Sequence, residues 1–376
     1  MRGMTLAMKW TRRRFATPLF ALAVTLAVAG LGLAIATPAE AQSEGRDVEA
    51  TQPVGGQVPG AALGGNSDAE IWRAVRRGLQ GNVSIPNKQA GVMIQSEGDN
   101  WRAGRNGPLT VTSAWIVLGM IGLLALFFAV RGRIKIDAGP AGRTVERFNA
   151  VERFAHWLTA VSFILLGLTG LNLLFGRHVL LPVLGPEVFA ALTLGGKYVH
   201  NYVGFAFMAG IVLMLVLWIR HNIPSKYDLA WIAKGGGLFV KGVHPPSEKF
   251  NAGQKVIFWA VILGGGSLSV SGVALLFPFE LALFAGTFEF LNLFGAGLPT
   301  ELTLMEEMQL SQLWHALAGV IMIAIILAHI YIGSMGMEGA FDAMGSSQVD
   351  ANWAREHHNL WYAKLEQGAE RQQPAE

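Results

Sequence analysis

Residues 313–333 read LWHALAGVIMIAIILAHIYIG, a stretch that contains His315 and His329 and no charged side chain. An α-helix rises about 1.5 Å and turns about 100° per residue, so the spacing of the two histidines gives a rise of roughly 21 Å and returns within about 40° of the same face. Both imidazoles are therefore predicted to lie on one face of one helix, near opposite sides of a bilayer core about 30 Å thick. Ionisable residues inside a membrane span usually mark a functional site, and two on one face indicate two stacked sites.

The composition of the whole chain agrees with a membrane location. Of its 376 residues, 52% are hydrophobic and only 15% are charged, a balance typical of proteins with several membrane spans. We therefore predict an all-α, polytopic membrane helix bundle. The chain has no cysteine, which excludes disulfides, covalent haem attachment through C-x-x-C-H and iron–sulfur clusters held by thiolates. A bound metal would have to be held by histidine, methionine or carboxylate side chains.

Five apolar stretches have the length of about 20 residues that a spanning helix requires. They are residues 109–130, 157–176, 198–219, 256–279 and 313–337. The connection 280–312 also contains an apolar stretch, but Glu289 lies in its middle. We expect this stretch to be an interfacial or re-entrant segment on the outer face, and not a sixth span.

The N-terminal part of the chain has the features of an exported protein. Residues 1–41 form a predicted signal peptide, with a basic start, an apolar run and small residues before Gln42. The apolar run is also long enough to remain as an uncleaved anchor, which is the alternative. Residues 42–108 are rich in Gly, Gln and Asn, and we predict a largely irregular periplasmic segment.

Basic residues alternate between the connections and predict the orientation of the chain. Connections 131–155 and 220–255 carry six Lys or Arg each, whereas 177–197 carries two, and 280–312 carries none together with five Glu. Because cytoplasmic loops are enriched in Lys and Arg, the first two connections are predicted to be cytoplasmic. The N-terminal segment is then periplasmic, and the tail 341–376 is cytoplasmic.

Four of the nine histidines lie at or inside span ends and fall into two levels. His200 and His315 begin spans at the predicted outer face, while His156 and His329 lie towards the inner face. Two haems, each held by two imidazoles, would need this pattern, since neutral imidazole is a strong axial ligand. Hydrogen bonds across the bundle, metal ions or a proton relay are alternatives, although the cores of the spans hold no Asp or Glu for a proton path.

The remaining histidines and the glycines of the spans have different expected environments. Solvent or interface positions are expected for the histidines of the connections and tail, namely His178, His221, His244, His357 and His358. Intramembrane glycines could admit a macrocycle or a neighbouring helix close to the backbone; they are Gly167, Gly170, Gly204, Gly210, Gly272 and Gly319.

Several runs resemble the cytochrome b (gamma) subunit of membrane-bound formate dehydrogenase, within the wider di-haem cytochrome b561 and nickel–iron hydrogenase cytochrome b family. The resemblance extends over roughly residues 144–365, and HNIP and FNAGQK are its most specific pieces. The runs include RTVERFNAVERFAHW (143–157), KYVHNYVG (197–204), RHNIPSKYDLAWI (220–232), KFNAGQKVIFW (249–259) and NWAREHHNLWYAKL (352–365).

The resemblance implies a four-helix di-haem domain over residues 143–340, with 109–135 as an additional N-terminal transmembrane helix and cytoplasmic turn. It implies two haems b, one with the axial pair His200 and His315 and the other with His156 and His329. It also implies a quinone, menaquinone or ubiquinone, bound beside His329 by Asn251, Gly253 and Gln254. Amide groups suit a quinone carbonyl because they donate hydrogen bonds, and glycine lets the ring approach the backbone.

The function implied by the resemblance is electron transfer in the bacterial inner membrane. Electrons would come from an iron–sulfur beta subunit on the periplasmic side and reach quinone near the cytoplasmic side. A catalytic alpha subunit with a molybdenum or tungsten pterin would oxidise formate, which this chain would not do itself. The alternatives are a cytochrome b subunit of a nickel–iron hydrogenase or another b561-like quinone reductase, and a membrane anchor without cofactor.

Overall fold

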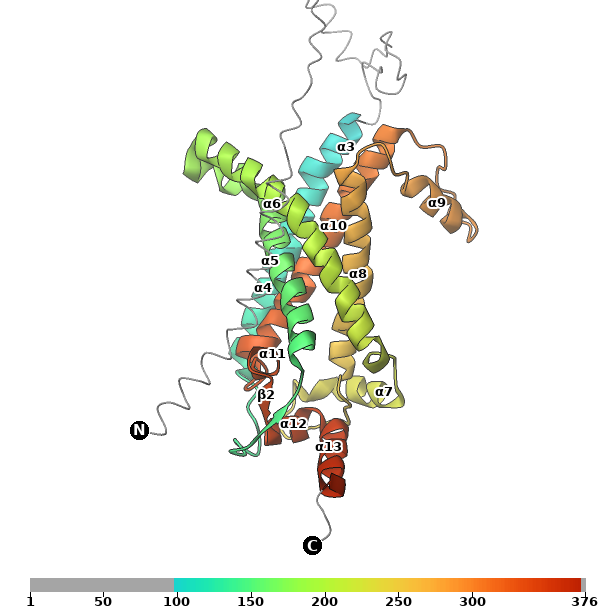
Figure 1. Cartoon of the computed structure of the whole chain (residues 1–376). Coiled ribbons are helices and arrows are strands. Elements are labelled where there is room, and N and C mark those ends of the chain that lie inside the picture. Colours follow the sequence, from blue (N-terminus) through green and yellow to red (C-terminus); the bar gives the residue numbers. More distant parts are fainter. Residues whose placement is uncertain (1–97, 373–376) are drawn as a thin grey trace, which may run out of the picture.

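The computed structural model describes residues 98–372, so the predicted signal peptide and most of the predicted periplasmic segment lie outside the described residues. The described part is a bundle of long helices with a small two-stranded sheet at one end (Figure 1). The predicted fold class, an all-α polytopic membrane bundle, is confirmed.

Within residues 98–372, five helical segments are long and apolar enough to cross a membrane, and each contains one of the stretches predicted from the sequence or most of it. The first combines α3 (Gly98–Gly104), the π-helical segment η1 (Arg105–Leu109) and α4 (Thr110–Arg131). The others are α5 (Ala150–Val179), α6 (Leu181–Trp218) with the 3-10 turn η2 (Ile219–His221), α8 (Ala252–Leu276), and α10 (Leu304–Tyr331) with the π-helical segment η4 (Ile332–Gly336). His315 and His329 therefore lie on one continuous helix, as the spacing predicts.

Three of these spanning helices begin with a capping box. The N-cap side chain accepts a hydrogen bond from the backbone three residues on, and the side chain there accepts one from the N-cap backbone. These pairs are Asn149 with Glu152 for α5, Asn251 with Gln254 for α8, and Thr303 with Glu306 for α10. Such caps stabilise a helix start by about 1 kcal/mol, and they fix where each span begins.

Neighbouring helices approach one another closely at glycines, which have no side chain. A Cβ atom on Gly210 of α6 would lie 2.4 Å from Thr159 Oγ1 of α5, and one on Gly264 of α8 would lie 2.6 Å from Met322 Sδ of α10. Helix α10 packs against α8, α4 and α5, and lies inside the bundle in Figure 1. This central position lets its two histidines face different neighbours.

The connection predicted to be interfacial contains α9 (Phe284–Asn292). Nine residues are too few to span a bilayer, and Figure 1 shows α9 projecting from one end of the bundle. Phe290, Leu293 and Phe294 are exposed there. An interfacial location on the outer face stays a prediction.

The opposite end of the bundle carries a compact cap, which we define as residues 132–149, 222–251 and 337–372. The strands β1 (Thr144–Glu146) and β2 (Gln348–Asp350) pair antiparallel in this cap, with Val145 opposite Val349. Phe148, Phe250, Trp353 and Tyr362 are buried in its hydrophobic core, where Phe148 and Phe250 pack against Trp218 at the end of α6. Its helical elements are α7 (Lys226–Ala233), η3 (Gly235–Gly237), α11 (Asp342–Gly345), α12 (Ala351–His357) and α13 (Asn359–Gln372).

Candidate functional site

The four histidines of the spans form two cross-helix pairs. The ring centres of His200 (α6) and His315 (α10) are 6.1 Å apart, and those of His156 (α5) and His329 (α10) are also 6.1 Å apart. A metal–imidazole bond is about 2 Å long and the ring centre lies roughly 1 Å beyond the nitrogen, so two imidazoles on opposite sides of one metal have centres about 6 Å apart. Both pairs therefore have the spacing of two axial ligands of one iron.

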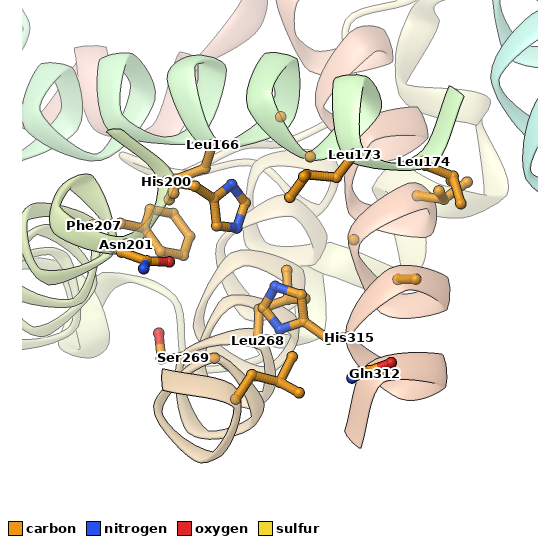
Figure 2. Close-up of a pocket in the computed structure, with 18 of the residues that line it drawn as sticks. Leu166, Leu173, Leu174, His200, Asn201, Phe207, Leu268, Ser269, Gln312 and His315 are labelled. Carbon is orange, nitrogen blue, oxygen red and sulfur yellow. The ribbon is translucent and has the colours of Figure 1, made fainter. Parts of the chain in front are cut away.

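The first pair lines a large apolar cavity, shown in Figure 2, where the two rings face one another from separate helices. Its volume of 410 Å³ lies within the range of about 300–1,000 Å³ that is usual for ligand pockets. The lining includes Leu166, Leu173, Phe207 and Leu268. The size and the apolar lining suit the body of a porphyrin ring.

Glycines widen this cavity, because a side chain at their positions would lie against the two histidine rings. A Cβ atom on Gly272 would lie 3.4 Å from His315 Cε1, and one on Gly170 would lie 3.6 Å from His200 Cε1. Five of the six intramembrane glycines expected to admit a macrocycle or a helix line the cavity: Gly167, Gly170, Gly204, Gly272 and Gly319. The sixth, Gly210, serves helix packing instead.

Two hydroxyl groups orient the rings of this pair. Thr169 Oγ1 donates its hydrogen to Leu165 O (2.7 Å), so it accepts one from Nδ1–H of His200 at 2.8 Å. Ser271 Oγ likewise donates to Ser267 O (2.9 Å) and accepts from Nδ1–H of His315 at 2.9 Å. These contacts fit the tautomer with the hydrogen on Nδ1 in both rings, which leaves Nε2 with the lone pair that an iron needs. Neither hydroxyl could be identified from the sequence, because Thr169 and Ser271 lie 31 and 44 residues from their partners.

Arg105 was also missed, and it lines the same cavity from the added N-terminal span. Of the described residues around this cavity, Arg105 alone carries a permanent charge. Its guanidinium donates to Asn106 Oδ1 at 2.9 Å. A cation at the rim of an apolar pocket favours a ligand with an anionic group at that end, because the low dielectric strengthens the attraction.

The second pair lies near the cap, at the N-terminal end of α5 and the C-terminal end of α10. The ring of His156 packs edge-on against Trp157, with centres 5.4 Å apart. His156 Nδ1 is buried and has no hydrogen-bond partner within residues 98–372. A buried nitrogen without a hydrogen bond costs free energy in an apolar environment. Binding of a ligand by the ring of His156 would explain why it is buried there.

The segment Asn251–Gln254 begins α8 at the cap end of the bundle (Figure 1). The capping bonds use the two amide oxygens, since Asn251 Oδ1 accepts from Gln254 N (2.9 Å) and Gln254 Oε1 accepts from Asn251 N (3.1 Å). Each side chain then presents its NH₂ group, with two donor hydrogens. Gly253 lies against Trp231, because a Cβ atom there would be 2.8 Å from the indole. The segment thus has a structural role that the sequence analysis did not identify.

A polar network holds the chain just before this segment. Glu152 Oε1 accepts from Lys249 Nζ (2.6 Å) and from Trp218 Nε1 (2.9 Å), and Arg147 donates to the carbonyl of Lys249. His358 Nδ1 donates to Glu248 O at 2.9 Å. These bonds join the start of α5, the start of α8 and the C-terminal tail.

Burial lowers the pKa values of two groups in this network, Arg147 and His358. Burial lowers the pKa of Arg147 to about 9, although the nearby carboxylate of Glu152 raises it. Burial and the adjacent Arg147 hold the pKa of His358 well below 6.5, so this ring is neutral at pH 7. The expectation of a solvent or interface position was wrong for His358, which is 1% exposed. Its polar neighbours are remote in sequence, so the tail alone could not reveal its burial.

Comparison with known proteins gives one family match. The model of the prokaryotic cytochrome b561 family matches residues 147–346, which is just over half of the 376-residue chain. The matched part begins in the cap at Arg147 and includes all four histidines of the two pairs.

Individual proteins are similar over most of their own length. The cytochrome b556 subunit of nitrate-inducible formate dehydrogenase from Escherichia coli K12 is 28% identical over 236 residues, 62% of this chain and 97% of that protein. The cytochrome b556(fdo) subunit of formate dehydrogenase from the same strain is 29% identical over 229 residues, 61% of this chain and 96% of that protein. The formate dehydrogenase cytochrome b556 subunit of Haemophilus influenzae is 26% identical over 222 residues, 58% of this chain and 82% of that protein.

Proposed function

Because this chain belongs to the prokaryotic cytochrome b561 family, we propose that it is the membrane-anchoring, di-haem electron-transfer subunit of a formate dehydrogenase. The observation that carries the proposal is the presence of two histidine pairs, each with ring centres 6.1 Å apart. Formate dehydrogenase cytochrome subunits are among the similar proteins, which supports this complex over a hydrogenase. Membership of a cytochrome b family implies haem b as the cofactor.

His200 and His315 would hold one haem b, and His156 and His329 the other. The glycine-lined cavity and the hydroxyl partners of the first pair support this assignment, because they leave room for a macrocycle and free Nε2 for the iron. Bound haem would supply reversible one-electron chemistry. The protein orients the axial rings, excludes water with apolar side chains and sets the distance between the two levels, roughly 21 Å along α10.

Arg105 would bind a propionate group of the haem held by His200 and His315. Haem b carries two carboxylates, and a guanidinium binds a carboxylate with directed hydrogen bonds. The side chain already lines the cavity. This contact would give the added N-terminal span a role at the outer haem site.

A quinone would bind at the cap end, near His329. Asn251 and Gln254 would donate hydrogen bonds to a quinone carbonyl through their NH₂ groups, which the helix cap leaves available. Gly253 would keep the backbone accessible at the start of α8. The polar network of Arg147, Glu152 and Lys249 would hold this segment in register.

The distribution of Lys and Arg supports the proposed orientation. The cap would face the cytoplasm of the inner membrane, and the first haem would face the periplasm, where an iron–sulfur subunit and a molybdenum- or tungsten-pterin subunit would dock. Electrons would then cross towards the cytoplasmic side, where quinone takes up protons. Moving one charge across 100 mV costs or releases about 2.3 kcal/mol, so this direction couples formate oxidation to the membrane potential.

His200→Ala in the purified complex tests the proposal. The electron path to quinone should be cut, because the iron near the donor subunit loses an axial ligand. We expect formate-dependent quinone reduction to fall at least about 100-fold, while formate oxidation with an artificial dye stays within about twofold because the catalytic subunit is untouched.

His178→Ala is the matched control, since His178 is an exposed histidine near the end of α5. Quinone reduction that survives His200→Ala would contradict the proposed path. Co-purification with hydrogenase subunits, identified by mass spectrometry of the same complex, would contradict the assignment to formate dehydrogenase.

A further inference from the structure

Three segments of the cap that are remote in sequence bring metal-binding side chains together. Asp137 follows α4, His244 lies between α7 and α8, and Glu356 belongs to α12. Asp137 Oδ2 and His244 Nε2 are 3.2 Å apart, and the ligand atoms of all three residues lie within 4.8 Å of one another. Side chains at this spacing can bind one ion between them.

A fourth side chain, that of His357, lies beside this group but is not one of the three whose ligand atoms are within 4.8 Å of one another. The rings of His357 and His244 have centres 6.3 Å apart, longer than the roughly 5 Å expected for two imidazoles on one tetrahedral ion, so the ring of His357 would move towards the ion on binding. His357 Nε2 is buried and has no hydrogen-bond partner among residues 98–372. Asp137, His244 and His357 line a cavity of about 10 Å³, which is the size of one water molecule or one ion.

Backbone hydrogen bonds hold the two carboxylates in place. Glu356 Oε2 accepts from Asp137 N (2.9 Å) and Glu356 Oε1 from Ala138 N (2.8 Å), while Asp137 Oδ2 accepts from Gly242 N (2.9 Å). A carboxylate oxygen has two lone pairs, so these bonds leave further acceptor capacity for a cation. Fixed ligands lose little conformational entropy when an ion binds.

We propose that Asp137, His244, Glu356 and His357 form a binding site for a divalent transition-metal ion of the zinc type, separate from both haem sites. Two imidazole nitrogens and two carboxylates match the nitrogen and oxygen ligands that Zn²⁺ prefers at four positions. Thiolates are absent from the set, as they must be in a chain without cysteine. Arg131, Lys135 and Lys241 also line this cavity, and the two carboxylates offset part of their positive charge.

The bound ion would cross-link three segments of the cap. It would join the connection after the added N-terminal span, the connection between α7 and α8, and the C-terminal tail. The second of these segments leads into the start of α8, where the proposed quinone ligands lie. The metal site does not depend on the proposed function, since its residues bind neither haem nor quinone.

Zinc binding by the full chain tests the site. The purified, haem-loaded protein is treated with a chelator, dialysed against Zn²⁺, and analysed for zinc per chain by mass spectrometry of the elements. We expect one zinc ion per chain. His244→Gln and His357→Gln should each weaken zinc binding at least about 100-fold, because each removes a direct ligand and even outer partners of a metal site contribute 10–100-fold.

His178→Gln is the matched control and should bind zinc as the unmodified chain does, because His178 is exposed and lies outside the cluster. An unchanged haem absorption spectrum shows that each variant is folded. Asp137→Asn replaces His357→Gln if that variant loses haem, since Asp137 is exposed. Absence of bound zinc in the unmodified chain, or zinc binding equal in all variants, would overturn the proposal.

Discussion

At the scale of single residues, a metal-binding histidine almost always hydrogen-bonds through its second ring nitrogen. Thr169 and Ser271 provide this for His200 and His315, since each hydroxyl accepts from Nδ1–H while donating to its own helix. The histidines themselves could be singled out from the sequence. Their hydroxyl partners could not, because the pairing depends on how α5 and α8 are rotated about their axes.

Thr169→Val and Ser271→Ala should raise the midpoint potential of the haem held by His200 and His315. A hydrogen bond from Nδ1–H makes an imidazole a stronger donor to iron, which favours the oxidised form, so removing the acceptor favours the reduced form. We also expect haem affinity at this site to fall by about 10–100-fold. Redox titration followed by visible absorption measures the potentials of both haems.

Ser269→Ala is the control, because Ser269 lines the same cavity and donates to Gly265 O. Its effect on the potential should be small. If Thr169→Val and Ser271→Ala moved both haem potentials equally, or neither, these hydroxyls would have no specific role at the first pair.

At the scale of elements, the start of α8 combines a structural and a proposed binding role. The sequence marks FNAGQK through a resemblance, whereas the structure shows that Asn251 and Gln254 cap the helix. A substitution that destroys the cap would therefore confuse a loss of stability with a loss of quinone binding. The two roles use different atoms of the same amide, so they can be separated.

Asn251→Ser separates them, because serine also caps helices but lacks the amide NH₂ group. We expect haem content to be unchanged and kcat/KM for quinone to fall about tenfold, the value of one lost hydrogen bond of about 1.4 kcal/mol. Steady-state quinone reduction by the complex measures this. Thr303→Ser alters the cap of α10 at the other end of the bundle and is the control; quinone kinetics unchanged in Asn251→Ser would count against the site.

The added N-terminal span is the second element with a proposed role. Arg105→Gln removes the permanent charge from the outer cavity, and we expect the potential of that haem to fall, opposite to the effect at Thr169 and Ser271. A positive charge favours the reduced iron, which carries one positive charge fewer. Arg102→Gln, an exposed position one turn earlier, is the control in the same redox titration. An unchanged haem potential in Arg105→Gln would contradict a role for this span at the haem site.

At the scale of the whole molecule, much of the architecture could be predicted from hydropathy and charge. Each of the five spans appears where an apolar stretch of sufficient length predicts it, because the bilayer imposes both length and composition. The cap could not be predicted, since its core joins residues such as Phe148, Trp218 and Trp353 through contacts remote in sequence. The same holds for the Asp137, His244, Glu356 and His357 cluster, which only the folded chain assembles.

The two histidine levels belong to this scale as well, because α10 contributes one histidine to each level and the other two come from α5 and α6. The central claim is that one chain holds two haems b, one per level. The pyridine haemochrome assay, combined with protein quantification, counts them directly. We predict two haems b per chain in the unmodified protein, one in His200→Ala, one in His156→Ala and none in the double variant. A preparation without b-type haem, or two haems remaining in either single variant, would contradict the account.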